Sequence, residues 1–202
     1  MRMSWKFLTG IAVLVALLLI TGAGSAIVSK LSFYANIARL YTQTPDTRLA
    51  MPLTAVSKRQ IADTWHAPRG TDRVHEGQDI FAPEGTPILS ATSGYVYKIG
   101  ENNLGGKTVS IIGAGGRVYY YAHLDAYNPQ LSEGDSVTTR TVLGFVGTTG
   151  NAQGTPPHLH FGIYTSTGAI NPLPLLTDRT NTATRPRPES TPARRTTVNR
   201  RV

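Results

Sequence analysis

Apolar residues are distributed along this chain in three ways, and each predicts a different kind of structure. No charged residue occurs between Phe7 and Ser29, and ten consecutive apolar residues run from Ile11 to Ile20. From about Trp65 to Leu176 the apolar residues come instead in short runs separated by glycine-rich turns. After residue 177 few apolar side chains remain to offset the entropy of ordering the chain. The pattern predicts an N-terminal apolar helix, a β-rich middle and a disordered tail.

The apolar segment within residues 1–29 has two interpretations that the sequence leaves open. A membrane-spanning helix needs about 20 mainly apolar residues, and the stretch from Phe7 onward is long enough. Arg2 and Lys6 precede it, so the positive-inside rule places the N-terminus in the cytoplasm. The rival interpretation is a cleaved signal peptide, with the small residues Gly24 and Ala26 before a possible cleavage site. Either a membrane anchor or a signal peptide would place the rest of the chain outside the cytoplasm.

Residues 30–64 are expected to form a connector that is partly helical. Between Lys30 and Tyr41 a helix would gather apolar side chains on one side, and Thr44-Pro45-Asp46 would end it. The side chains on that side are Leu31, Tyr34, Ile37, Ala38 and Tyr41. The sequence does not decide whether this segment is a stalk or packs on the following domain.

The stretch 65–176 reads as a domain of short β-strands. Five runs rich in β-branched and aromatic residues are predicted to be strands, namely Gly94–Ile99, Lys107–Ile112, Arg117–His123, Val142–Val146 and His158–Tyr164. Glycine-containing turns separate most of them, and no long helical period occurs. We therefore expect an all-β fold, with an antiparallel sheet or sandwich.

Charge is unevenly divided between the middle and the ends of the chain. Residues 1–64 hold seven Lys/Arg and two Asp/Glu, residues 65–176 hold six and eight, and residues 177–202 hold seven and two. A nucleic-acid-binding domain would carry its basic excess on the folded part, so nucleic acid is not an expected partner. The basic tail either docks on an anionic wall polymer or lipid, or is only a solvated tail. The chain has no cysteine, which excludes disulfides and Cys-ligated metals.

Two short motifs in the β-rich stretch carry potential metal ligands. His75 and Asp79 are four residues apart, and an extended segment would place both on one face. His158 and His160 are two apart in a predicted strand, so they share a face while Leu159 turns toward the core. Either motif alone is more often an exposed pair than a ligand pair.

A third run places His123 after Tyr119 and Tyr121, and strict alternation would put all three on one face. The three runs together are much more specific than each alone, because imidazole and carboxylate are the usual ligands of a catalytic zinc ion. Such an ion takes three protein ligands and keeps an open position, which makes hydroxide available near neutral pH. His66, the remaining histidine, lies outside all three runs and is expected at the surface or groove rim.

In the order and spacing of these motifs the chain resembles the lysostaphin-type (LytM-domain) zinc endopeptidases. The matching segments are His75–Ile80, Ala82–Pro87, Gly94–Val96, Tyr121–Leu124, Glu133–Val137, Val146–Gly150 and His158–Phe161. The resemblance implies a LytM-type β-fold with a substrate groove over residues 65–176. It implies a zinc endopeptidase that hydrolyses peptide bonds in bacterial peptidoglycan, in the cell envelope outside the cytoplasmic membrane or in secreted form.

The resemblance also implies roles for five residues. His75, Asp79 and His160 would ligate one zinc ion, and His123 and His158 would be catalytic, one accepting the proton of water while the other polarises the scissile carbonyl. The glutamate of an HExxH motif is absent, so an imidazole with a pKa near 6.5 is the expected base.

Departures from the family pattern leave all five positions intact. Gly162 follows HLHF where an acidic residue is common, so another group would have to support a histidine from outside the ligand shell. Thr139-Arg140 replaces a turn that is often glycine-containing, and Thr155-Pro156-Pro157 is one residue longer than the common form.

Two alternatives to this function remain. The chain could be a non-catalytic LytM-fold regulator that activates another wall hydrolase, or a secreted protease with a protein substrate. In the favoured interpretation its partners are peptidoglycan peptides and, through the N-terminal helix, the membrane.

Overall fold

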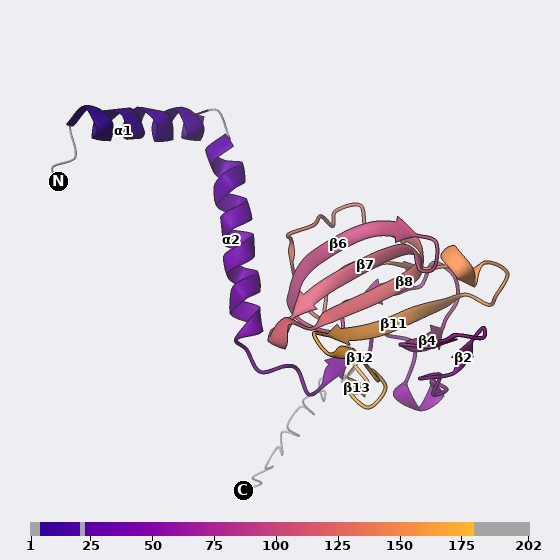
Figure 1. Ribbon diagram of the computed structural model, residues 1–202. Coiled ribbons are helices and arrows are strands. Elements are labelled where there is room, and N and C mark those ends of the chain that lie inside the picture. The colour runs from indigo at the N-terminus through magenta and orange to yellow at the C-terminus, as the bar shows by residue number, and fades with distance from the viewer. Residues whose placement is uncertain (1–4, 21–22, 180–202) are drawn as a thin grey trace, which may run out of the picture.

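The computed structural model describes residues 5–20 and 23–179. Two helices, α1 (Trp5–Ile20) and α2 (Ala23–Tyr41), precede a β domain. Figure 1 shows α1 and α2 extending away from the domain at an angle to each other, with the curved strands β6, β7, β8 and β11 forming the body of the molecule. Residues 180–202, most of the predicted basic tail, lie outside the described residues.

The N-terminal apolar segment does not form the single long helix that was predicted. It divides between α1 and α2, and α1 has 16 residues. At 1.5 Å per residue α1 is about 24 Å long, short of the roughly 30 Å hydrocarbon core of a bilayer. Within residues 5–20 and 23–179, no helix combines the length and the apolar character that crossing a membrane requires. The predicted transmembrane helix is therefore not supported.

Helix α2 contains the predicted helix, but most of the side expected to pack is exposed. Leu31, Tyr34 and Tyr41 of the expected apolar face are exposed, whereas Leu40 is buried. Phe33 meets Tyr95 edge-on, with ring centroids 6.2 Å apart. The prediction of the buried side was largely wrong because it used the spacing of apolar residues alone. The position of the domain decides which side of the helix is covered.

The domain is built on a nine-stranded sheet whose pairings are all antiparallel. Six strands follow in the order β12-β11-β8-β7-β6-β9, and β4 pairs with β11, β10 with β8, and β5 with β10. The strands are β4 (Gln78–Phe81), β5 (Pro87–Leu89), β6 (Gly94–Asn102), β7 (Gly106–Gly113), β8 (Val118–Tyr127), β9 (Ser136–Val137), β10 (Val142–Val146), β11 (His158–Thr165) and β12 (Gly168–Ile170). The predicted antiparallel β-fold is confirmed.

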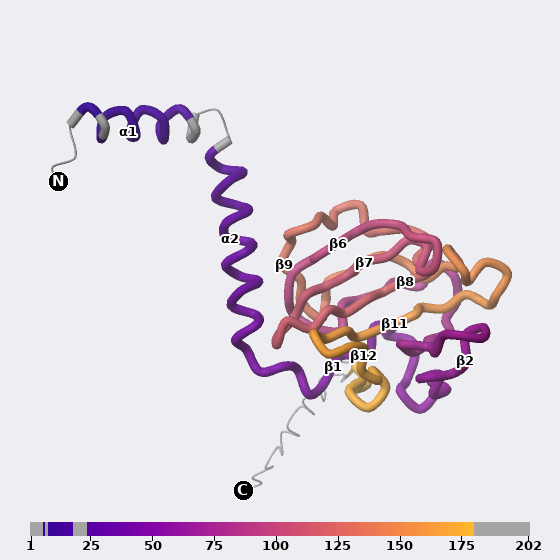
Figure 2. The backbone as a smooth tube through the Cα atoms, in the orientation of Figure 1, coloured from indigo at the N-terminus to yellow at the C-terminus, as the bar shows by residue number. Residues whose placement is uncertain are grey.

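Short elements complete the domain. Strands β2 (Pro68–Arg69) and β3 (Arg73–Val74) form a separate hairpin, and β1 (Leu49–Ala50) pairs in parallel with β13 (Leu176–Thr177). Three single-turn helices occupy loops: η1 (Lys58–Gln60), η2 (Ala114–Gly116) and η3 (Gly150–Ala152). Figure 2 shows β1 beside the lower strands of the domain, with β9 at the opposite edge next to β6.

The core includes segments on both sides of the 65–176 stretch. Leu49, Met51 and Leu53 are fully buried with Leu176 in the same cluster as Phe161 and the other inward-facing residues of the sheet. The connector thus packs on the domain over these residues, a question that the sequence left open. Farther on, the Arg179 guanidinium donates hydrogen bonds to three backbone carbonyls, those of Met51, Ser90 and Thr139.

The burial of Met51 gives a direct test of this packing. Met51→Ala should lower the free energy of unfolding by about 2–5 kcal/mol, because it removes a fully buried side chain and leaves a cavity. Tyr97→Ala is the control, since Tyr97 lies on β6 with its side chain exposed and should change the value by less than about 0.5 kcal/mol. Urea unfolding measures both. Equal stability of Met51→Ala and the parent would contradict the placement of the connector.

Candidate active site

The pairing of β4 with β11 brings two of the predicted metal ligands together. Asp79 lies directly opposite His160 in the register of these strands, and Phe81 lies opposite His158. Directly opposed residues project on the same side of a sheet. The carboxylate and both histidines of the HxH motif therefore reach one side, and Leu159, between them, is fully buried as predicted.

His75 approaches from the segment just before β4, and Gly77 makes that approach possible. A Cβ at Gly77 would lie 2.6 Å from the Cε1 atom of His160 and 2.7 Å from its Nε2 atom. A side chain there would collide with the imidazole ring. The glycine in the His-x-Gly-x-Asp spacing is thus needed for close approach of the backbone to His160.

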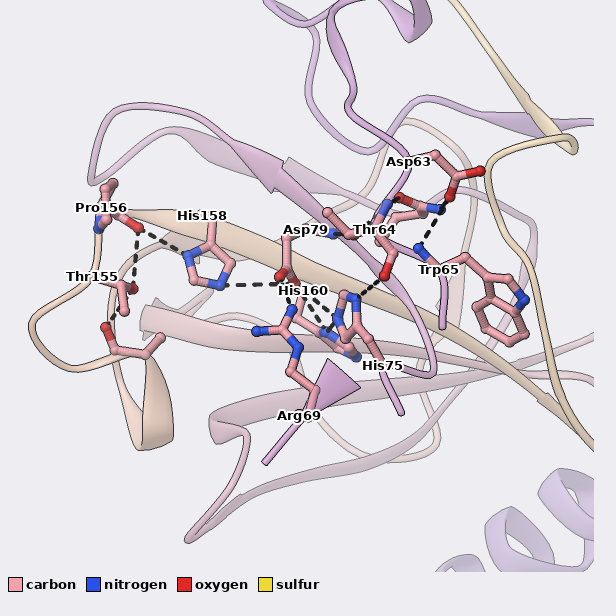
Figure 3. Close-up of polar contacts among 12 residues, drawn as sticks. Asp63, Thr64, Trp65, Arg69, His75, Asp79, Thr155, Pro156, His158 and His160 are labelled. Atoms are coloured by element: carbon pink, nitrogen blue, oxygen red, sulfur yellow. Dashed lines mark hydrogen bonds and ion pairs between the residues drawn. The ribbon is translucent and has the colours of Figure 1, made fainter. Parts of the chain in front are cut away.

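The three candidate ligand atoms form a compact triangle (Figure 3). His75 Nε2 lies 2.8 Å from His160 Nδ1 and 3.1 Å from Asp79 Oδ1, and His160 Nδ1 lies 3.2 Å from the same oxygen. Tetrahedral ligands at 2.0–2.1 Å from a zinc ion are separated by about 3.3 Å. Two imidazole nitrogens and one carboxylate oxygen in this arrangement fit a tetrahedral metal ion with its fourth position free.

The carbonyl oxygen of Thr64 fixes the tautomer of His75. His75 Nδ1 donates a hydrogen bond to this oxygen at 2.8 Å, so the lone pair of Nε2 faces the other two ligands. Thr64 is in turn held by Gln78, whose Oε1 atom accepts from the Thr64 backbone N–H at 3.0 Å. Such a partner orients a metal-bound imidazole and raises its basicity. It is a backbone group, so no side-chain motif could have predicted it.

The two carboxylate oxygens of Asp79 have different partners. Oδ1 faces the imidazoles, whereas Oδ2 forms an ion pair with Arg69 of β2. Burial raises the pKa of Asp79, but the hydrogen bonds with His160, His75 and Arg69 outweigh it and hold the pKa well below its ordinary value. Asp79 is therefore a carboxylate at neutral pH, and Arg69 favours its use of one oxygen toward a metal. Sequence spacing did not single out Arg69.

His123 reaches the site through a β-bulge and not through the alternation of β8. The register of β8 against β7 shifts between Tyr121 and Leu124, and His123 has a positive φ of 65°. A bulge inserts one extra residue and turns a side chain to the other face. Tyr119 and Tyr121 are fully buried in the core, whereas His123 lines the cavity. The expectation that these three side chains share a face is therefore wrong.

His123 and His158 lie beside the ligand triangle with similar hydrogen bonding. The Nδ1 atom of His123 donates to the Thr149 carbonyl and that of His158 to the Pro156 carbonyl, each at 2.9 Å. Their ring centroids are 5.0 Å apart, and His158 Nε2 lies 3.9 Å from Asp79 Oδ1. In the neutral form each ring keeps a lone pair on Nε2, so both can accept a proton.

Burial lowers the pKa of His123 to about 4, which makes this imidazole neutral at pH 7. The pKa of His160 is also lowered by burial. Both groups bind a proton more readily in the unfolded chain than in the fold, so stability should fall as pH falls from about 6.5 toward 4.

A pH prediction follows for chelator-treated protein. Its free energy of unfolding should drop by about 2 kcal/mol between pH 7 and pH 4.5. His123→Gln should reduce this drop, because glutamine does not titrate. Urea unfolding at the two pH values measures it. An unchanged drop in the variant would contradict the buried neutral state of His123.

A cavity of about 590 Å³ surrounds these groups, and the candidate ligands, His123 and His158 all line it. Tyr120, Tyr164 and Asn151 contribute to its walls. Tyr119 and Tyr121, on either side of Tyr120 in the sequence, are in the core instead. His66, the histidine outside the motifs, is exposed and stacks on Trp65, with ring centroids 4.4 Å apart.

Gly162, at which the family pattern led us to expect an acidic residue, has little room for a larger side chain. A Cβ at this position would lie 3.0 Å from the Tyr164 ring and 3.2 Å from the Glu76 carbonyl oxygen. A larger residue would need Tyr164 to move. The support that an acid could give to a ligand histidine comes here from the Thr64 carbonyl bonded to His75.

Comparison with known proteins agrees with this geometry. The model of peptidase family M23 matches residues 73–172, which include all five histidine and aspartate positions of the site. This chain belongs to peptidase family M23. Family M23 is a metallopeptidase family, and the His75–Asp79–His160 group is a possible metal site within it.

Among similar proteins, the L-Ala–D-Glu endopeptidase of Bacillus subtilis is 36% identical over 138 residues, covering 63% of this chain and 42% of its own length. The DD-carboxypeptidase/endopeptidase Mpg of Neisseria meningitidis serogroup B is 35% identical over 127 residues, covering 63% and 26%. This chain thus spans less than half the length of these relatives. The catalytic domain of lysostaphin from Staphylococcus simulans has a TM-score of 0.51 and 31% identity, covering 57% of this chain and 90% of that domain.

Proposed function

We propose that this protein is a zinc-dependent endopeptidase that hydrolyses peptide bonds in bacterial peptidoglycan. In this proposal His75, Asp79 and His160 hold one zinc ion, and His123 and His158 are catalytic. The observation that carries it is the ligand triangle with edges of 2.8, 3.1 and 3.2 Å, next to two imidazoles with free Nε2 atoms in one cavity.

When bound, zinc supplies Lewis acidity toward a carbonyl oxygen and toward water. The protein's own part is proton transfer and charge stabilisation. In the neutral rings of His123 and His158, Nε2 is the unprotonated nitrogen, because Nδ1 donates to a backbone carbonyl in each. One imidazole accepts the proton of the attacking water, and an imidazolium donates to the developing oxyanion or the leaving amine.

Asp79 is poorly placed to serve as the base. Both oxygens of Asp79 are engaged, one by the imidazoles of His75 and His160 and the other by Arg69. The proton acceptor in this proposal is therefore a histidine, in agreement with the absence of an HExxH glutamate.

The relatives support peptidoglycan as the substrate. The similar proteins include the L-Ala–D-Glu endopeptidase of Bacillus subtilis and the peptidoglycan DD-endopeptidase ShyC of Vibrio cholerae, which is 34% identical over 96 residues. We place the activity outside the cytoplasmic membrane, where the wall lies. The charge-free run after Arg2 and Lys6 supports export of the domain.

The site disfavours the alternative of a non-catalytic regulator, because the ligand triangle and both additional histidines are present together. Digestion of purified walls by the full chain, with and without chelator, tests the proposal. We expect release of peptide fragments that chelation stops and zinc restores, with the cleaved bond identified by mass. Walls left intact by zinc-loaded protein, or digestion that chelation does not affect, would contradict it.

A further inference from the structure

Two arginines stand side by side at the edge of the cavity. Arg69 on β2 and Arg73 on β3 are direct partners in the register of this hairpin, and both line the cavity. Opposed residues of an antiparallel pair project on the same side. Since Arg69 reaches Asp79 from that side, Arg73 projects from the hairpin toward the same site.

Like charges directly opposite each other on a β-ribbon are destabilising. Asp79 offsets the charge of Arg69, although Arg69 Nε is buried and has no hydrogen-bond partner in the part of the chain that the structure describes. The side chain of Arg73 is exposed, and the ion pairs found within residues 5–20 and 23–179 do not include it. Arg73 therefore adds to the hairpin a cation that forms no ion pair with another described residue.

The charges on the cavity wall are confined to this part of the chain. Apart from the site histidines, all the charged lining residues fall between Arg69 and Asp79. The other wall is neutral, with Asn102, Leu104 and Asn151 among its members. A charged group on a bound peptide would thus be recognised only on the hairpin side.

We propose that Arg73, beside Arg69, forms a binding site for a carboxylate of the substrate. The substrate class is then a peptide with a free carboxylate close to the scissile bond, and not a neutral oligoglycine. A guanidinium presents paired N–H donors that match a carboxylate in shape and charge. This inference rests on the proposed function, because it concerns the same groove.

Two acidic residues limit the size of the effect. Asp72 and Glu76 also line the cavity and are exposed, so they lower the positive potential around Arg73. Solvent and salt screen an exposed cation further. We therefore expect a preference of about tenfold for the carboxylate form of a substrate.

The test compares two substrates with the zinc-loaded full chain. One is a peptidoglycan stem peptide with free carboxylates, and the other is the same peptide with each carboxylate converted to a carboxamide. The parent should show a kcat/KM about tenfold higher for the carboxylate peptide, mainly through KM, and added salt should reduce the ratio. Arg73→Gln should bring the ratio to about one, and Arg73→Glu should invert it. Arg140→Gln, at an exposed arginine outside the cavity lining, should keep the parental ratio.

The outcomes separate this inference from the proposed function. Cleavage of both peptides with equal kcat/KM, or a ratio that Arg73→Gln leaves unchanged, would overturn the carboxylate site alone. Preferential cleavage of the carboxamide peptide or of pentaglycine would overturn it as well. Failure to cleave any peptide, together with intact walls, would overturn the proposed function itself.

Discussion

We expect the His160→Ala variant to bind no zinc ion. Its rate of wall hydrolysis should therefore fall by on the order of a thousandfold or more. The imidazole of His160 supplies one corner of the ligand triangle, within 3.2 Å of the candidate ligand atoms of His75 and Asp79. Two remaining ligands cannot fix a metal ion with the three-ligand geometry of a catalytic site. His75→Ala should behave in the same way, because Nε2 of His75 is equally close to the other two ligand atoms.

His66→Ala is the matched control for this experiment. It also removes an imidazole, but His66 is exposed and does not line the cavity. Its zinc content and activity should equal those of the parent. Zinc content is measured by metal analysis after gel filtration, and activity by release of soluble wall fragments. A His160→Ala protein that keeps one equivalent of zinc and parental activity would show that the ligands are elsewhere.

The second large effect is expected at His123 and His158, which the proposed function places beside the metal and not among its ligands. His123→Ala should lower the rate of hydrolysis by on the order of a hundredfold or more while zinc stays bound. The Nε2 atom of His123 is the free, basic one, and the ring lies beside the triangle, with its centroid 5.9 Å from that of His160. His158→Ala should give a loss of similar size for the same reason.

The double variant His123→Ala/His158→Ala sharpens this division of roles. In the proposed function the two imidazoles act on one proton and one developing charge, so their losses should be less than additive. Metal analysis of each variant shows whether zinc remains. Equal zinc loss in His123→Ala and His160→Ala would refute the separation of catalytic from ligand histidines.

Much of the sheet could be predicted from sequence because its main strands are long, and because their residue types and the turns that flank them both indicate a strand. Runs such as Lys107–Ile112 and His158–Tyr164 combine β-branched and aromatic residues between turn signals, and both lie within strands of the structure. The grouping of His158 with His160 followed from the two-residue period of a strand. Short strands such as β9 (Ser136–Val137) carry too few residues for any period to show.

The details of the site that sequence missed depend on tertiary structure. Strict strand alternation predicted that the side chain of His123 lies on the same face as those of Tyr119 and Tyr121. A bulge in β8, where the pairing with β7 shifts register, instead turns the His123 side chain into the cavity. The carbonyl of Thr64 leaves no trace in sequence, because every residue has one. No strand or helix period relates Arg69 to His75 and Asp79. It reaches Asp79 only because the β2–β3 hairpin folds toward the site.

The helices illustrate a similar limit. Apolar content alone predicted one span within residues 1–29, whereas the structure has two helices, the first of 16 residues. The side of α2 that packs on the domain is set by Phe33 and Leu40 and by what lies opposite them. Periodicity describes a helix by itself and carries no information about the position of its partner.

Anomalous diffraction at the zinc absorption edge, from crystals of the zinc-loaded protein, tests the central claim most directly. The account predicts one strong peak about 2.0–2.2 Å from His75 Nε2, Asp79 Oδ1 and His160 Nδ1. That peak should lie beside, and not bonded to, the imidazoles of His123 and His158. A peak at any other group of residues, in protein that digests walls, would contradict it.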